Sequence, residues 1–205
     1  MRATRKIYLS IITKEIDMRI ITGKAKGKRL DTLDGLDTRP TSERTKEAVF
    51  SMLQFDIEGR RVLDLFAGSG QMGLEALSRG AAQAYLVDRG RAAYDVIKKN
   101  IIKSGLIDGA VALCEDSISF LKRQRGDIRF DIVFLDPPYA STLIDEALKL
   151  LFQKNLLKSS SYIVCESDRF EILDEENLKN YEVIKTMKHG VAHISVLKAR
   201  LGDEL

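Results

Sequence analysis

Strand-like and helix-like segments alternate along most of the chain, and this alternation constrains the fold more than any other feature. Short apolar runs predict five strands, at 62–65, 84–87, 111–114, 130–135 and 162–165. Apolar residues at helical spacing predict helices between them, at 69–79, 91–104, 117–124 and 141–152. Two more predicted strands, 181–187 and 192–197, are joined too closely for a crossover helix and should pair antiparallel. The expected fold is α/β and Rossmann-like, with seven mostly parallel strands, an antiparallel last strand and helices on both faces.

The chain divides into three parts. Residues 1–17 have no clear pattern, and we interpret them as an N-terminal extension. Residues 18–40 are basic and contain glycines, which predicts a small β-hairpin with strands at 19–22 and 28–33. Residues 41–205 form the main domain, which begins with a helix capped by Ser42 and carries Thr45, Ala48, Val49 and Met52 on one stripe.

Composition fits one soluble domain, with 44% hydrophobic and 31% charged residues among 205. No apolar run approaches the roughly 20 residues of a membrane helix, and residues 1–17 lack the apolar core of a secretion signal, so we expect a cytoplasmic protein. We also expect a monomer without a metal site. The two cysteines, Cys114 and Cys165, fall in predicted strands. We expect reduced core thiols there, not a disulfide or a nucleophile.

Positive charge is concentrated near the start of the chain. The formal net charge is only +3, yet the stretch from Arg19 to Arg29 holds five basic residues and no acidic one. Such a surface predicts a polyanionic partner, although a run of charge is also what an ordinary solvated face carries.

A glycine loop follows the first predicted strand. Gly68, Gly70 and Gly73 satisfy G-x-G-x-x-G, and Asp88 lies 20 residues after Gly68, at the end of the second strand. Glycines let a ligand approach the backbone, and an acid at that place binds ribose hydroxyls. The motif alone fits a nicotinamide dinucleotide, S-adenosylmethionine or a purely structural strand–turn–helix.

Carboxylates around the loop favour S-adenosylmethionine. Asp64 lies on the first strand, just before the loop, where it would repel a pyrophosphate but suit the ammonium group of S-adenosylmethionine. Its structural alternative is a buried turn former. Asp116 follows the third strand at the same edge of the sheet, where it could accept from an adenine amino group, cap the next helix, or do both.

The segment Asp136-Pro137-Pro138-Tyr139 follows the fourth strand at the same edge. Two prolines stiffen the turn and remove two backbone donors, which leaves acceptors only. Such acceptors fit an exocyclic amino group, which donates two hydrogens, and Tyr139 offers a flat face for an unstacked base. The expected reaction is methyl transfer to a nucleobase amino group, driven mainly by alignment.

These motifs resemble those of class I methyltransferases that modify nucleobase amino groups. The stretches 19–23, 27–30 and 39–50 narrow the resemblance to the bacterial 16S ribosomal RNA guanine-N2 methyltransferases, the RsmD family, over residues 18 to about 200. The resemblance implies a catalytic site of Asp136, Pro137, Pro138 and Tyr139. It implies a cofactor site of Asp64, Phe66, Ala67, Gly68, Ser69, Gly70, Asp88, Arg89, Asp116 and Ser117. It implies an RNA surface of Lys24, Lys26, Lys28, Arg29, Arg39, Thr41 and Arg44, with 16S rRNA of the small subunit or of an assembly intermediate as partner.

Three departures and three alternatives accompany the resemblance. Gln71 replaces a small residue of the family, His189 and His193 occupy the closing strands, and residues 1–17 have no family counterpart. The alternatives are an adenine-N6 methyltransferase, a nicotinamide-dependent oxidoreductase and a non-catalytic RNA-binding module.

Overall fold

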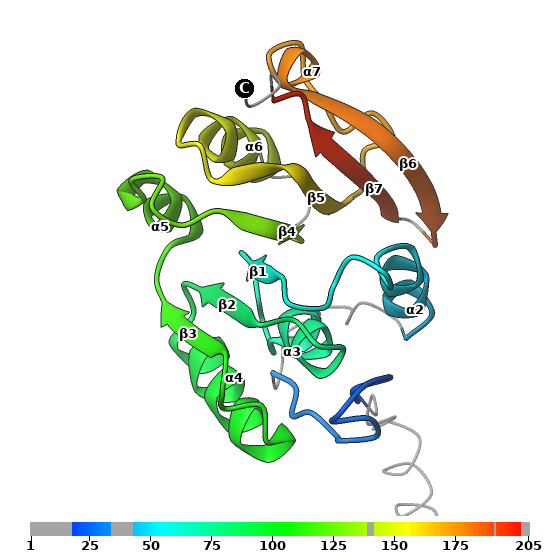
Figure 1. The fold of residues 1–205 in the computed structure, drawn as a ribbon, viewed down its shortest axis with the longest axis vertical. Helices are drawn as coiled ribbons and strands as arrows, with labels where there is room; N and C mark the ends of the chain where they lie inside the picture. The colour runs from blue at the N-terminus through cyan, green and yellow to red at the C-terminus, as the bar shows by residue number, and fades with distance from the viewer. Residues whose placement is uncertain (1–17, 34–42, 139–141, 191, 202–205) are drawn as a thin grey trace, which may run out of the picture.

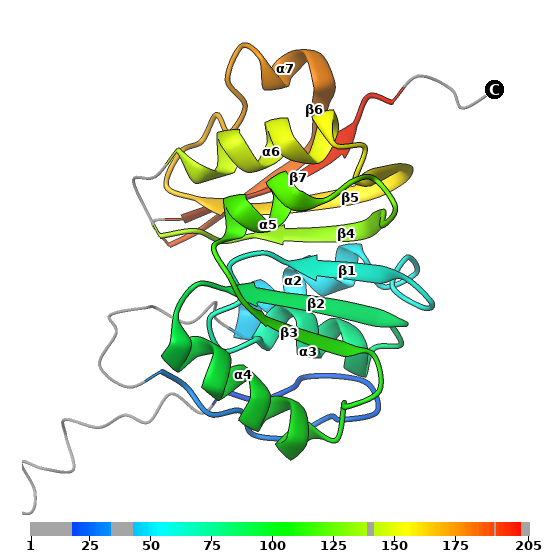
Figure 2. The same cartoon turned by 90° about the vertical axis from the view of Figure 1, so that its left-hand side faces the viewer.

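The computed structural model describes residues 18–33, 43–138, 142–190 and 192–201. It is a Rossmann-like three-layer fold in which helices cover both faces of a seven-stranded sheet (Figure 1, Figure 2). The strands are β1 (Arg61–Asp64), β2 (Gln83–Asp88), β3 (Ala110–Cys114), β4 (Phe130–Leu135), β5 (Leu157–Ser167), β6 (Tyr181–His189) and β7 (Ala192–Ala199). The helices are α2 (Glu43–Met52), α3 (Gln71–Ser78), α4 (Arg91–Ser104), α5 (Ser117–Arg123), α6 (Leu143–Gln153) and α7 (Asn177–Asn180).

The sheet confirms the predicted topology. Its order is β3-β2-β1-β4-β5-β7-β6, and β1 to β5 pair in parallel. Strand β7 lies antiparallel between β5 and β6. Two details differ from the sequence prediction. Strand β5 starts at Leu157 rather than 162, and the prediction missed its first residues because they are mostly polar. The short helix α7 precedes β6, and no periodicity in the sequence predicted it.

Each face of the sheet has its own apolar core. Helices α2, α3 and α4 pack on one face, and α5 and α6 pack on the other (Figure 2). Within β4, Phe134 belongs to the first core and Leu135 to the second, as the alternation of side chains along a strand requires. Among the described residues no helix is long and apolar enough to cross a membrane.

The basic N-terminal segment, residues 18–33, folds back on itself but pairs through a single antiparallel bridge, Arg19 with Arg29. Backbone bonds from Ile20 to Lys28, from Leu30 to Met18 and from Gly27 to Ile20 join the two arms, and the pairing is shorter than predicted because the next two amides donate to α3. The Ile21 and Thr22 amides donate to the Glu75 carboxylate at 2.7 and 3.0 Å. Figure 1 shows the segment, in blue, beside α3 and α4.

The turn of this segment lies directly on the end of α3. The Lys24 amide donates to the Ser78 carbonyl at 2.8 Å, and the Ala25 amide donates to the Ser78 hydroxyl at 2.9 Å. A Cβ on Gly23, whose φ is +87°, would come within 1.8 Å of the Ser78 carbonyl oxygen. The contact therefore requires glycine, and the segment is part of the main domain's packing.

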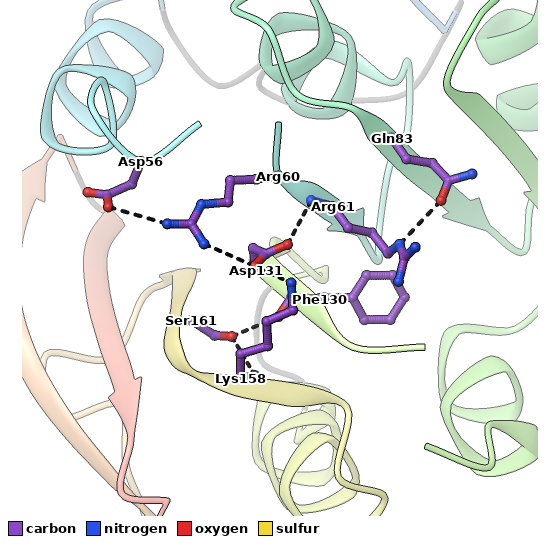
Figure 3. A network of polar contacts seen from close by, with 8 residues as sticks. All are labelled: Asp56, Arg60, Arg61, Gln83, Phe130, Asp131, Lys158 and Ser161. Carbon is purple, nitrogen blue, oxygen red and sulfur yellow. Dashed lines mark hydrogen bonds and ion pairs between the residues drawn. The ribbon is translucent and has the colours of Figure 1, made fainter. Parts of the chain in front are cut away.

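An ion-pair network joins β1, β4 and β5 at the end of the sheet opposite their carboxyl ends (Figure 3). The buried Asp131 carboxylate accepts from Lys158 Nζ at 2.7 Å, from the Arg61 amide at 2.9 Å and from Arg60 at 3.2 Å. Burial alone would raise the pKa of Asp131, but these donors hold the pKa below its ordinary value. The network is structural, since it lies away from the predicted site.

The two cysteines have different environments. Cys165 is buried, and burial raises the pKa of its thiol. The prediction of a core thiol is wrong for Cys114, which is exposed because β3 is the edge strand of the sheet. Neither thiol is in a disulfide.

Candidate active site

The predicted site residues gather where the parallel strands end. Asp64 and Asp88 are the last residues of β1 and β2, and Asp116 and Asp136 follow β3 and β4 closely. Carboxyl ends of neighbouring parallel strands meet at one edge of a sheet, so the fold brings these four carboxylates to the same rim.

The glycine loop has the backbone that its sequence demands. Gly68 and Gly70 have φ of +53° and +81°, values that side chains disfavour. A Cβ on Gly73 would lie 2.5 Å from the Leu86 side chain, so this glycine allows α3 to pack closely on β2. Ala67 and Ser69 are buried and Phe66 is half-buried. A Cβ on Gly68 would meet no atom of the described residues within 4 Å, so the loop faces open space there.

Asp64 has the structural role that the sequence allowed, and its contact with a cofactor stays a prediction. It is buried, and its Oδ2 accepts from the Gly73 amide at 3.0 Å, which ties β1 to the first turn of α3. Burial, helped by the charge of Asp88, raises the pKa of Asp64 to about 7 although the Gly73 amide opposes the rise. A buried carboxylate with so high a pKa is one that a cation would stabilise.

Asp88 binds the backbone of the glycine loop. Its two carboxylate oxygens accept from the Gly68 and Gly90 amides at 2.9 and 2.8 Å. Each oxygen keeps acceptor capacity for a hydroxyl group. Arg89, beside it, is exposed.

The third strand contributes a helix cap. Asp116 is exposed, and its Oδ1 accepts from the Ser119 amide at 2.9 Å, which is the predicted N-cap of α5. This bond is the main cause that lowers the pKa of Asp116. The Ser117 hydroxyl is buried and donates to the Leu65 carbonyl at 2.6 Å, so it fixes the loop after β1. An adenine contact from Asp116 stays a prediction.

The acceptor turn after β4 borders a pocket. Asp136 and Pro138 are exposed, Pro137 is buried, and Tyr139 lies outside the described residues. The pocket is small and partly open to solvent, and it lies between α2, α3, β4, β5 and β7. Its walls are mostly apolar, with the polar groups Thr45, Asp136 and Glu166 among the residues that line it.

Sequence reasoning missed a residue that connects the loop to the N-terminal segment. Asn100 is fully buried in α4, and its amide nitrogen donates to the Ser69 carbonyl at 2.9 Å and to the Asp31 carbonyl at 3.0 Å. Its oxygen accepts from the Asp31 amide at 2.7 Å. The Ser69 hydroxyl adds a contact to Met18 Sδ at 3.2 Å. The available signal was a polar residue beside Ile101 on the buried stripe of α4.

A second missed group is the amine of Lys46 in α2. It is buried, donates to the Arg19 carbonyl at 2.8 Å, and has its pKa lowered chiefly by burial. Its sequence neighbours Thr45 and Val49 were predicted to be on the inner stripe, and both are buried. Lys46 thus holds α2 to the N-terminal segment.

The predicted RNA-binding residues divide into two groups. Arg39 and Thr41 lie outside the described residues, and the other five, Lys24, Lys26, Lys28, Arg29 and Arg44, are all exposed. The turn that carries Lys24 lies at Ser78, the last residue of α3, whereas the glycine loop precedes Gln71, the first. One helix length of roughly 11 Å therefore separates the basic turn from the rim.

Of the other departures, His193 packs edge-on against Phe170, with ring centroids 5.6 Å apart, as a sheet-packing histidine. The side chain of His189 lies outside the described residues. The Gln71 Oε1 is buried and has no hydrogen-bond partner among the described residues.

Comparison with known proteins places the chain. A family model described as "Conserved hypothetical protein 95" matches residues 18–198. The ribosomal RNA small subunit methyltransferase D of Haemophilus influenzae is 34% identical over 177 residues, which cover 85% of this chain and 90% of that protein. The chain belongs to the ribosomal RNA small subunit methyltransferase D family, the RsmD family.

Two Escherichia coli comparisons agree with this membership. The family member of strain K12 is 39% identical over 153 residues, which cover 74% of this chain and 75% of that protein. A solved E. coli structure described as a methyltransferase has a TM-score of 0.77 at 33% identity and covers 89% of this chain and 97% of its own. The fold is that of class I methyltransferases.

Proposed function

We propose that this protein transfers a methyl group from S-adenosylmethionine to the exocyclic N2 of a guanine in 16S ribosomal RNA of the small subunit. The observation that supports this most is the acceptor turn at Asp136, which borders a mostly apolar pocket that Met72 in the first turn of α3 also lines. Family membership favours a methyl donor over a nicotinamide cofactor and a ribosomal RNA substrate over DNA.

The residues at the rim fit the proposed cofactor. Asp64 would meet its ammonium group, Asp88 its ribose and Asp116 its adenine, while the open side of Gly68 leaves room for it against the backbone. When bound, S-adenosylmethionine supplies an electrophilic methyl group. Phe66, Ala67, Ser69 and Gly70 would contribute the loop surface, and Arg89 and Ser117 the edges of the site.

The acceptor turn would prepare the amino group for attack. Asp136 would accept a hydrogen bond from the N2 amino group, which draws the nitrogen toward tetrahedral geometry and frees its lone pair. Pro137 and Pro138 would keep the turn stiff, and Tyr139 would stack on the base. Among the described residues that line the pocket there is no histidine or lysine, so alignment would carry most of the rate.

The decisive experiment maps small-subunit rRNA from a strain that lacks this gene. We expect one N2-methylguanine to disappear in a nucleoside-resolved mass map and to return when the gene is restored. Purified protein should then methylate rRNA from the deletion strain, offered both naked and in subunits. Loss of an N6-methyladenine instead would overturn the guanine assignment.

Cofactor affinity should depend on pH through Asp64. The pKa of Asp64 is raised to about 7. Below that pH, a proton therefore competes with the ammonium group for the Asp64 carboxylate. We expect the affinity for S-adenosylhomocysteine, measured by calorimetry, to rise by up to about tenfold per pH unit below 7 and to level off above it.

Asp64→Asn provides the control, since its amide does not titrate and its affinity should stay flat with pH. By the same linkage, protonated Asp64 stabilises the protein without cofactor. This contribution to the free energy of unfolding should be complete at pH values below the ordinary aspartate pKa and should be lost as pH rises through about 7. Equal pH profiles for the wild type and Asp64→Asn would contradict the role of Asp64.

RNA binding should depend on the basic turn. Lys26 and Lys28 are both exposed, and replacing both by glutamate should weaken RNA binding and reduce the slope of log affinity against log salt by about one or more per residue. Filter binding across a salt series measures both effects. Lys179→Glu, an exposed change on α7, is the matched control. If the slope of log affinity against log salt is unchanged in the double variant, the basic turn is not part of the RNA-binding surface.

A further inference from the structure

Glu166 is a second carboxylate at the same pocket, and no motif predicted it. Leu135 of β4 is paired with Cys165 of β5, so Asp136 and Glu166 follow matched positions on neighbouring parallel strands. Phe134 and Val164, two residues earlier on each strand, both belong to the core under α2 and α3. By the alternation of a strand, Asp136 and Glu166 project on that same face, and both line the pocket.

The acceptor turn alone does not choose between purines. Guanine and adenine each present an amino group that donates two hydrogens, and Asp136 can accept from either. The bases differ at the neighbouring ring nitrogen, N1, which donates a hydrogen in guanine and accepts one in adenine. An ionised carboxylate only accepts, so a second carboxylate beside the first distinguishes the two bases.

We propose that Glu166 selects guanine by accepting a hydrogen bond from N1–H while Asp136 accepts from the N2 amino group. This inference rests on the proposed function and adds the group that reads the base. The remaining pocket walls are mostly apolar, including Val49, Met72 and Ile194. A wrong base would set its N1 lone pair against the Glu166 carboxylate, and neither acceptor would find a donor on these apolar walls, which is costly.

The test uses an RNA substrate in which the target guanine is replaced by 2,6-diaminopurine. That base keeps the N2 amino group that receives the methyl, but its N1 is an acceptor. We expect wild-type protein to prefer guanine by at least about 100-fold in kcat/KM. In Glu166→Gln the amide can donate to N1 of diaminopurine or accept from N1–H of guanine, so the preference should fall by about tenfold or more.

Two controls separate base reading from general damage. Glu182→Gln, an exposed change on β6, should keep the wild-type preference. Glu166→Asp keeps an acceptor-only group, so it should retain the preference for guanine even if its rate falls. Affinity for S-adenosylhomocysteine should be unchanged in all three variants, because Glu166 is not among the residues proposed to hold the cofactor.

The outcomes are distinct. If Glu166→Gln loses rate on both substrates by the same factor, or if Glu166→Asp loses the preference as well, the reading role is overturned while the proposed function stands. If wild-type protein methylates neither base at N2, the proposed function falls and takes this inference with it. A collapsed preference in Glu166→Gln alone supports the role of Glu166.

Discussion

Asp136→Ala is expected to reduce the single-turnover rate of methyl transfer by at least about 10²–10³-fold, which is the cost of losing one preorganised polar group at a reacting atom. The carboxylate is exposed at the end of β4 and borders the pocket, so its removal should leave the core unchanged. Affinity for S-adenosylhomocysteine should change by less than about threefold, since Asp64 and Asp88 are untouched.

The measurement of the single-turnover rate needs two control variants. Asp127→Ala removes an exposed carboxylate near the other end of β4 and should retain full rate. Asp136→Asn keeps an acceptor without the charge and should fall between the wild type and Asp136→Ala. Near-normal turnover by Asp136→Ala would refute the proposed role of the acceptor turn, and a variant that leaves all cellular function intact would favour a non-catalytic RNA-binding module.

The second large effect concerns stability, and it lies in Glu75. This side chain is fully buried and accepts from the Ile21 amide, the Thr22 amide and Arg79 Nε, the last at 2.8 Å. Glu75→Ala leaves these part-buried donors without their acceptor and Arg79 without its ion pair. We expect a loss of about 3–5 kcal/mol in the free energy of unfolding, measured in urea.

Glu47→Ala, an exposed change on α2, is the comparison and should cost less than about 0.5 kcal/mol. Glu75→Gln keeps an acceptor for the backbone amides and should recover part of the loss. A cost below about 1 kcal/mol for Glu75→Ala would show that the N-terminal segment contributes little to the stability of the domain.

The fold could be predicted largely from local pattern. The helix Arg91–Ser104 and the strand Phe130–Leu135 match their predictions residue for residue, because an apolar stripe or run ends at clear signals such as Gly105. Patterns of this kind failed where the partner is distant in sequence. The pairing in the hairpin around Gly23 is shorter than predicted, because its Ile21 and Thr22 amides donate to α3, which no local pattern connects to it.

The candidate site shows the same division. Glycines, Asp64 and Asp88 were predictable, because strand ends and loop spacing fix them. Asn100 and Glu166 were not, since their importance depends on which elements the fold brings beside them. For Asp116 the pattern allowed a helix cap and a ligand contact, and the structure confirms the cap.

Because the N-terminal segment packs on α3 and α4, it can fold only after these helices have been synthesised. The Ile21 amide cannot make its hydrogen bond until Glu75, 54 residues later, has been synthesised. The Asp31 amide likewise needs Asn100, 69 residues later. At about 5–20 residues per second, the ribosome needs roughly 3–14 s to supply these partners. Met18 and Leu30 have no core to enter during that interval. The first described residues to leave the ribosome thus cannot complete these contacts until about half of the chain has been synthesised, and the bond from Asn100 to the glycine loop forms no earlier.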